Sequence, residues 1–161
     1  MHDSNLYREY EATFEIIENQ IFIKDIKIQI RIYSIDETIH NAEWKSVLEE
    51  VFPTKEDKII VWFTGLLVLP YGRSVEPVYS FPSGYENYIL LEINSGKLIK
   101  EKSFNNMEYE EFKDKQYQAF KKTEEYKELR AKLQNKYNSE EITESIIKDF
   151  IIEYTSKILT E

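Results

Sequence analysis

The sequence predicts an α+β fold: an antiparallel sheet of about five strands, one inserted helix, and two to three C-terminal helices packed on one face. Strand-period alternation dominates the first third of the chain, whereas helix-period stripes dominate everything after residue 105. No strand alternates with helices as a parallel sheet would require. The length of 161 residues with few Gly and Pro predicts a single domain over residues 1–161, with 1–10 frayed or forming a short helix.

The strongest strand signal lies near the N-terminus. Apolar residues at 12, 14 and 16 alternate with polar ones, residues 18–20 read as a turn, and residues 26–32 alternate strictly. The apolar members of the last segment are Ile26, Ile28, Ile30 and Ile32. We expect these four to point into one core, facing a helical stripe that contains Ile146, Phe150 and Tyr154.

A helix is predicted over residues 41–52. Trp44, Val47, Leu48 and Val51 have the i, i+3, i+4, i+7 spacing of one helical stripe. Asn41 can cap its start, and the Phe52-Pro53 pair can end it.

Residues 58–69 are the most apolar run and predict a central strand, with Gly65 at a bulge or bend. Residues 70–88 break the regular pattern, because three prolines and two glycines alternate there with aromatic residues. Residues 88–93 and 97–102 predict a hairpin, in which Gly96 suits the left-handed position of a short loop.

Two to three helices are predicted from residue 105 onward, because the segment before Ser139 can form either two helices or one kinked helix. Asn105 and Glu108 resemble a capping box, and Thr123 and Ser139 are suitable N-caps for the next two helices. The last helix should bury residues 142, 146, 150, 154 and 158, widened by 147 and 151.

Composition excludes several kinds of site. Without cysteine there are no disulfides, thiolate metal sites or thiol nucleophiles. The two histidines, His2 and His40, form no zinc-binding pair, and no phosphate loop or nucleophile elbow is present. We therefore expect no catalytic residues, no metal and no cofactor. An enzyme that uses carboxylates or tyrosines at an unrecognised site stays an open alternative.

The acidic charge is unevenly distributed. The net charge is −9, of which residues 1–57 carry −7, from 13 acidic and six basic residues. This sign disfavours nucleic acid and favours a basic protein partner, although such acidity can also serve solubility alone. No apolar run approaches the ~20 residues of a membrane span. An excess of Ile over Leu and of Lys over Arg suggests a bacterial, AT-rich gene, and we expect a cytoplasmic protein.

These observations favour a non-enzymatic binding protein, by analogy of class a bacterial immunity or antitoxin-like inhibitor of a basic toxin. The acidic candidates for partner contact are Glu37, Glu43, Glu49, Glu50 and Asp57. The aromatic 70–88 segment adds Tyr71, Arg73, Tyr79 and Tyr85. Two alternatives remain: this segment forms a small-ligand site, or its rings only fold back over the sheet.

Overall fold

The computed structural model describes residues 10–33, 39–75 and 84–160, with the backbone alone for 31–33 and 39–42. It confirms the α+β class, with six antiparallel strands and five helices in the described part of the chain. The contacts divide the chain into two compact units. Unit 1 is Met1–Trp62 with Ser95–Lys97, and unit 2 is Phe63–Asn94 with Leu98–Glu161. The predicted features of residues 1–9 lie outside the described residues.

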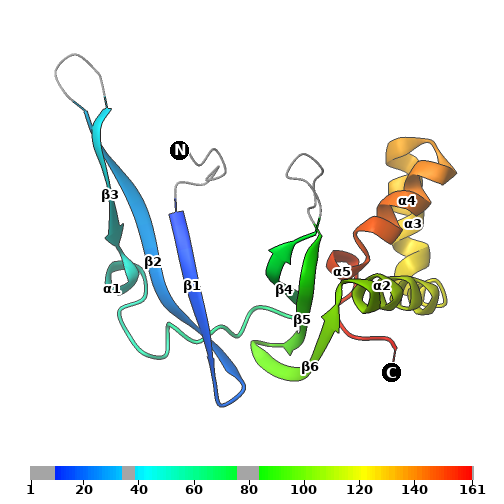
Figure 1. Ribbon diagram of the computed structural model, residues 1–161, viewed down its shortest axis with the longest axis horizontal. Coiled ribbons are helices and arrows are strands. Elements are labelled where there is room, and N and C mark those ends of the chain that lie inside the picture. The colour runs from blue at the N-terminus through cyan, green and yellow to red at the C-terminus, as the bar shows by residue number, and fades with distance from the viewer. Residues whose placement is uncertain (1–9, 34–38, 76–83, 161) are drawn as a thin grey trace. The chain divides into compact units, whose positions relative to one another are not determined.

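Unit 1 is built on three strands in which the long central strand pairs with both neighbours (Figure 1). They are β1 (Tyr10–Ile17), β2 (Gln20–Tyr33) and β3 (Ile39–Ser46). Glu18 and Asn19 have φ of 50° and 65°, so they form a two-residue hairpin turn between β1 and β2. The turn predicted at residues 18–20 and the strands on either side of it are confirmed.

The helix predicted over residues 41–52 is wrong for most of its length. Its first half is β3, and only the short helix α1 (Leu48–Val51) follows. Asn41 pairs with Ile32 in the sheet and caps no helix. β2 continues past Ile28, its last residue paired with β1, and pairs there with β3. This strand pairing stabilises residues 41–46 more than the helical stripe would stabilise a helix. Trp44 and Val51 are consequently exposed.

Unit 2 begins its sheet later than the sequence suggests. β4 (Gly65–Ser74) starts at Gly65, so the strand predicted from residue 58 is wrong up to residue 64, and Gly65 is no interior bulge. β4 pairs with β5 (Tyr85–Asn94) through Pro70↔Tyr88 and Ser74↔Tyr85. The two ends of the 70–88 segment are therefore paired strands, contrary to the predicted irregular structure, and residues 76–83 lie outside the description.

The predicted hairpin is confirmed between β5 and β6 (Lys97–Asn105), which are neighbours in the sheet. Ser95 and Gly96 turn the chain with φ of 48° and 74°. Gly96 is required by space as well, because a Cβ there would lie 1.4 Å from the carbonyl oxygen of Ile60. The Gly96 carbonyl accepts hydrogen bonds from Ile21 N at 2.9 Å and Gln20 Nε2 at 3.1 Å, so this turn belongs to unit 1.

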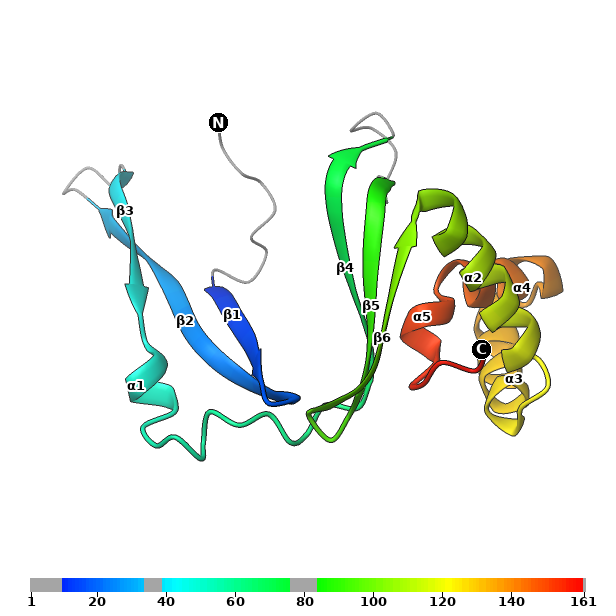
Figure 2. The same cartoon turned by 60° about the horizontal axis from the view of Figure 1, so that its bottom comes forward.

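The C-terminal helices are α2 (Asn106–Phe120), α3 (Glu124–Tyr137), α4 (Glu140–Asp149) and α5 (Ile151–Tyr154). All three predicted caps are confirmed: the Asn105–Glu108 capping box is complete, and Thr123 and Ser139 accept bonds from backbone amides. Within unit 2, α2 contacts β5 and α5 contacts β4, so helices cover one face of this sheet (Figure 2).

The core of unit 2 lies between these helices and β4–β5. Leu90, Ile147 and Ile151 are fully buried, and Tyr88 stacks on Tyr109 with ring centroids 4.1 Å apart. The last predicted helix breaks at Phe150 into α4 and α5. Its buried stripe is centred on residues 143, 147 and 151, so Phe150, predicted to be buried, is 51% exposed.

The predicted burial of the four alternating isoleucines is also wrong where it can be assessed. Ile26 is half-buried, whereas Ile28 and Ile30 are 38% and 41% exposed. The side chain of Ile32 lies outside the described residues. The alternation identified the strand correctly, but α1, the helix of unit 1 that contacts β2 among the described residues, is only four residues long, and Ile28 and Ile30 stay exposed.

Candidate functional site

The unit 1 sheet has an exposed apolar side in the described part of the chain. Partners across antiparallel strands share one face, and the register pairs Tyr10 with Ile28 and Phe14 with Ile23. We call the resulting surface the open face. It is formed by the exposed side chains of Tyr10, Phe14, Ile16, Ile28 and Ile30, which lie on β1 and β2.

A bulge in β2 keeps these side chains on one side. The register changes between Thr13, opposite Asp25, and Phe14, opposite Ile23, so Lys24 is an extra residue in β2. One extra residue reverses the alternation, so odd-numbered Ile21 and Ile23 join even-numbered Ile26, Ile28 and Ile30. The two isoleucines before the bulge are buried. Their β1 partners Ile16 and Phe14 are exposed, and so are Ile28 and Ile30 beyond the bulge.

The open face exposes enough apolar area to be a candidate interaction surface. Phe14 is 53% exposed and the other four side chains are 38–43% exposed. Since a large aromatic side chain can bury 150–250 Å², Phe14 and Tyr10 each expose roughly 90 Å², and the three smaller isoleucines bring the total to a few hundred Å². Contiguous apolar patches of that size on a folded protein commonly mark interaction sites.

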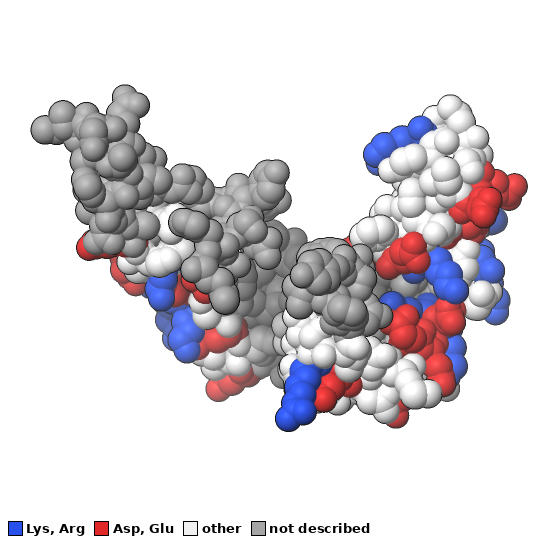
Figure 3. All heavy atoms as spheres, turned by 45° about the horizontal axis from the view of Figure 1, so that its top comes forward, with Lys and Arg blue, Asp and Glu red and all other residues white. Residues whose placement is uncertain are grey.

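Acidic residues without ion pairs accompany this surface. Lys24, Lys27, Lys45 and Lys58 each bind a carboxylate of unit 1 at 2.6–3.6 Å. Among the described residues of unit 1, five acidic residues have no ion-pair partner; they are Glu11, Glu18, Glu43, Glu56 and Asp57. Glu43 lies opposite Ile30 in the β2–β3 register and so borders the open face. The helices of unit 2 carry interspersed acidic and basic side chains (Figure 3).

The predicted acidic contact residues occupy different environments. Glu43 is exposed on β3, whereas Glu49 binds Lys58 at 2.6 Å and Glu50 binds Lys45 at 3.6 Å. Asp57 accepts hydrogen bonds from the backbone and hydroxyl of Thr54, so it closes a turn. Glu37 lies outside the described residues. Glu43 is therefore the predicted acid that is best placed for a partner.

The predicted aromatic contacts belong to unit 2. Tyr71 on β4 is 47% exposed, and Arg73 is exposed with its backbone N–H bound to Glu86. Tyr85 is half-buried against the core of unit 2. Tyr79 lies outside the described residues. The acidic and aromatic candidates are thus divided between the two units, and a ligand site on the 70–88 segment stays a prediction.

Sequence reasoning missed the open face as a candidate site because it assigned those side chains to a core. The signal that identifies the face is the three-residue step from Ile23 to Ile26, where the apolar positions change from odd to even. A strand that keeps its apolar residues on one side through such a step needs a bulge there.

A carboxylate with a perturbed pKa, Glu144 on α4, joins three helices. Tyr126 Oη donates to it at 2.6 Å and Arg130 Nε at 2.8 Å, and Tyr117 Oη donates as well. Partial burial opposes ionisation of Glu144, but these hydrogen bonds outweigh it and lower its pKa. Burial, followed by the bond to Glu144, raises the pKa of Tyr126 to about 12. A carboxylate held ionised by neutral phenols and an arginine stabilises helix packing and is poorly suited to donate a proton.

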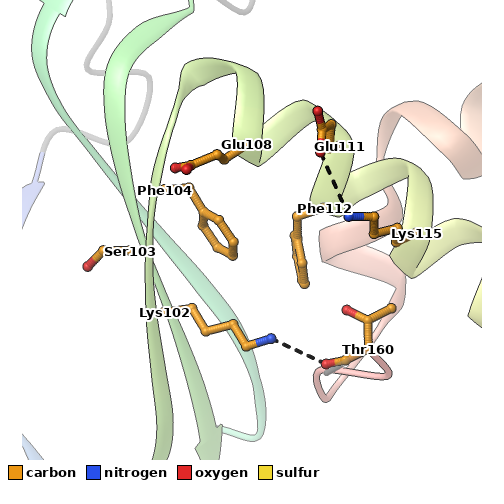
Figure 4. Close-up of a pocket in the computed structure, with 8 residues that line it drawn as sticks. All are labelled: Lys102, Ser103, Phe104, Glu108, Glu111, Phe112, Lys115 and Thr160. Carbon is orange, nitrogen blue, oxygen red and sulfur yellow. Dashed lines mark hydrogen bonds and ion pairs between the residues drawn. The ribbon is translucent and has the colours of Figure 1, made fainter.

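A pocket of about 320 Å³ lies beside β6, α2 and the C-terminal segment of unit 2 (Figure 4). Phe104 and Phe112 form its apolar wall, and Lys102 donates to the Thr160 carbonyl at 3.4 Å. Lys115 binds Glu111 at 3.8 Å, and Glu108 binds the Asn105 backbone within the capping box. The charged groups around this pocket are thus engaged with each other or with α2.

Neither a metal centre nor a membrane-spanning helix is found in the described residues. No group of three potential His, Asp or Glu ligands is clustered there. No described helix has both the length and the apolar character needed to cross a bilayer. Comparison with known proteins found no matching family model, no similar curated protein and no similar solved structure.

Proposed function

We propose that this chain is a non-enzymatic protein-binding protein, by class a bacterial immunity or antitoxin-like inhibitor, and that it binds a basic protein such as a toxin domain. The observation that carries the proposal is the exposed open face bordered by Glu43, a carboxylate without an ion pair among the described residues. Apolar contact on the open face would provide affinity, and the excess negative charge of unit 1 would favour a basic partner over an acidic one.

The distribution of charge supports the choice of partner. Unit 1 carries 13 acidic and eight basic residues, and four of its lysines are already bound to carboxylates. A surface of this sign attracts basic proteins and repels phosphate backbones. The proposal therefore includes neither nucleic acid nor membrane lipid as partner, and it places the protein in the cytoplasm.

The test is to isolate a partner and measure how fast it associates. Immobilised protein is exposed to host lysate at low salt, retained proteins are identified, and the purified partner is titrated at several salt concentrations. We expect a basic partner whose association slows with salt, because charge attraction is screened over roughly 8 Å at physiological ionic strength. Reversal of Glu43, Glu49 and Glu50 to Lys should slow association about tenfold or more.

The matched control reverses Glu124, Glu125 and Glu128, three exposed glutamates at the start of α3 in unit 2. It changes the net charge by the same amount at a different place. An acidic partner, or equal slowing by both triple variants, would contradict a binding surface on unit 1.

A further inference from the structure

Within the proposed function, we infer that the open face binds an amphipathic basic helix of the partner, lying along β2. The inference rests on three independent features of unit 1: which atoms are exposed, the dimensions of the exposed strip, and the position of its charges.

The exposed groups are side chains of a sheet face. Tyr10, Phe14 and Ile28 are 38–53% exposed, and they project from the face formed by the β1–β2 register. A partner strand added at a sheet edge would use backbone N–H and C=O groups and leave this face uncovered. An element that packs on the face buries these side chains directly, so the apolar area favours face packing over strand addition.

The dimensions of the strip match one helix. From Ile23 to Ile30 the strand rises seven residues, or about 23 Å at 3.3 Å per residue. A helix of about 15 residues has that length at 1.5 Å per residue. β1 and β3 both flank β2 at Lys27 and Ile28, where three strands about 4.8 Å apart span about 10 Å, the diameter of a helix with its side chains.

The charges at the edges select a basic helix over a second copy of this chain. On the β3 side, Glu43 borders the face opposite Ile30, and its neighbour Lys45 is neutralised by Glu50. At the hairpin end, Glu18 is exposed in the turn after β1. A second copy would bring carboxylates against carboxylates, whereas lysines flanking the apolar stripe of a helix would meet Glu43 or Glu18, according to which end of the strip the helix covers.

The experiment uses the full-length protein and two synthetic 15-residue peptides of identical Lys and Leu content. In one, the leucines recur with helical period; in the other, they alternate with the period of a strand. Binding is measured by fluorescence anisotropy, the conformation of the bound peptide by circular dichroism, and the mass of the protein alone by light scattering.

We expect the helix-period peptide to bind at least tenfold more tightly than its isomer and to be helical when bound. Phe14→Ser should weaken that binding about tenfold. Phe150→Ser should not, because Phe150 has nearly the same exposure, 51%, but belongs to unit 2. A Glu-for-Lys version of the helix-period peptide should bind poorly, and Glu43→Lys should improve its binding.

Several outcomes would overturn the inference. They are equal binding of the two isomers, equal effects of the two Phe→Ser changes, and a dimer of the free protein that Phe14→Ser dissociates. The proposed function is tested separately with the captured partner. If its binding is weakened by Glu43→Lys but not by Phe14→Ser, the protein binds a basic partner elsewhere on unit 1, and only the helix assignment fails.

Discussion

Ile30 on β2 lies directly opposite Glu43 on β3, so an exposed apolar side chain and a carboxylate without an ion pair among the described residues share one face of unit 1. Side chains directly opposite each other on adjacent antiparallel strands have their Cβ atoms only about 5 Å apart. A substitution at position 30 therefore reports on both the exposure of the face and the charge at its edge.

The first prediction concerns that pair. Ile30→Asp should be tolerated, at a cost of about 1 kcal/mol or less, because the position is exposed and only like-charge repulsion from Glu43 opposes it. Ile30→Lys, which can pair with Glu43, should cost less than Ile30→Asp. Ile23→Asp, at a position 6% exposed, should cost several kcal/mol or prevent folding. Chemical denaturation gives the three values, and equal loss at positions 30 and 23 would mean that the face is covered in solution.

The second prediction concerns Gly96. Gly96→Ala should destabilise the protein by more than about 2 kcal/mol, because its Cβ would overlap the Ile60 carbonyl oxygen and its φ of 74° is unfavourable for a side chain. Gly65→Ala is the matched control. There the nearest atom to a new Cβ is a Phe63 ring carbon at 3.2 Å, which can give way by a side-chain movement. Melting temperatures compare the two variants, and a Gly96→Ala protein as stable as the control would contradict the close turn.

The third prediction concerns the pH dependence given by Glu144. Its pKa is lowered in the folded state, so its stabilising contribution is complete above the ordinary carboxyl pKa of about 4.3 and is lost as pH falls further. Glu144→Gln should cost about 2 kcal/mol near neutral pH. It should also flatten the decline of stability in acid. Glu141 lies about one turn before Glu144 on α4 and is exposed, so Glu141→Gln should have neither effect.

The alkaline side of the same cluster gives the fourth prediction. The pKa of Tyr126 is raised to about 12, so its neutral hydroxyl stabilises the fold below the ordinary tyrosine pKa of about 10. That contribution is lost as pH rises through 12. Tyr126→Phe should therefore lower stability at neutral pH and reduce its further loss above pH 10. Denaturation midpoints between pH 7 and pH 11 measure both effects, and an unchanged alkaline slope would contradict the bond to Glu144.

The fifth prediction concerns the number of cooperative domains. A single domain over residues 1–161 stays a prediction, and it implies one calorimetric transition for the whole chain. The hairpin turn Ser95–Lys97 belongs to unit 1, although the strands that it joins lie mostly in unit 2. Unfolding of one unit should therefore strain the other. Two separate transitions, one of them shifted by Gly96→Ala and the other by Glu144→Gln, would show two independent domains.

Local signals in the sequence were reliable where a few neighbouring residues determine the structure. The caps at Asn105, Thr123 and Ser139 and the turns at Glu18-Asn19 and Ser95-Gly96 need only short-range geometry. The β2 strand was equally clear, because its strict alternation suits one structure only.

Predictions that depended on distant partners were less reliable. Residues 41–46 carry part of a helical stripe but pair with β2, and nothing local to them indicates that pairing. Residues 58–64 look like a strand, yet only Ile59 forms a bridge there, to Phe22. For the candidate site, Glu43 was identified from charge alone. The apolar face beside it was missed, because alternation shows which residues share a face and not whether anything covers that face.

The extra residue in β2 makes unit 1 sensitive to chain length in a way that no substitution reproduces. Deleting Lys24 would remove the bulge and leave Phe14 opposite Ile23 and Thr13 opposite Asp25 in a regular ladder, so the isoleucines at 21, 23, 26, 28 and 30 would stay on one face. Inserting one residue into β1 between Thr13 and Phe14 would instead give Lys24 a partner and also remove the bulge. Strict alternation would then place the isoleucines at 21 and 23 on the face opposite those at 26, 28 and 30, and would separate Phe14 from Tyr10 in the same way. The bulge is thus the one point in the hairpin where strand lengths, more than side chains, decide which surface is apolar.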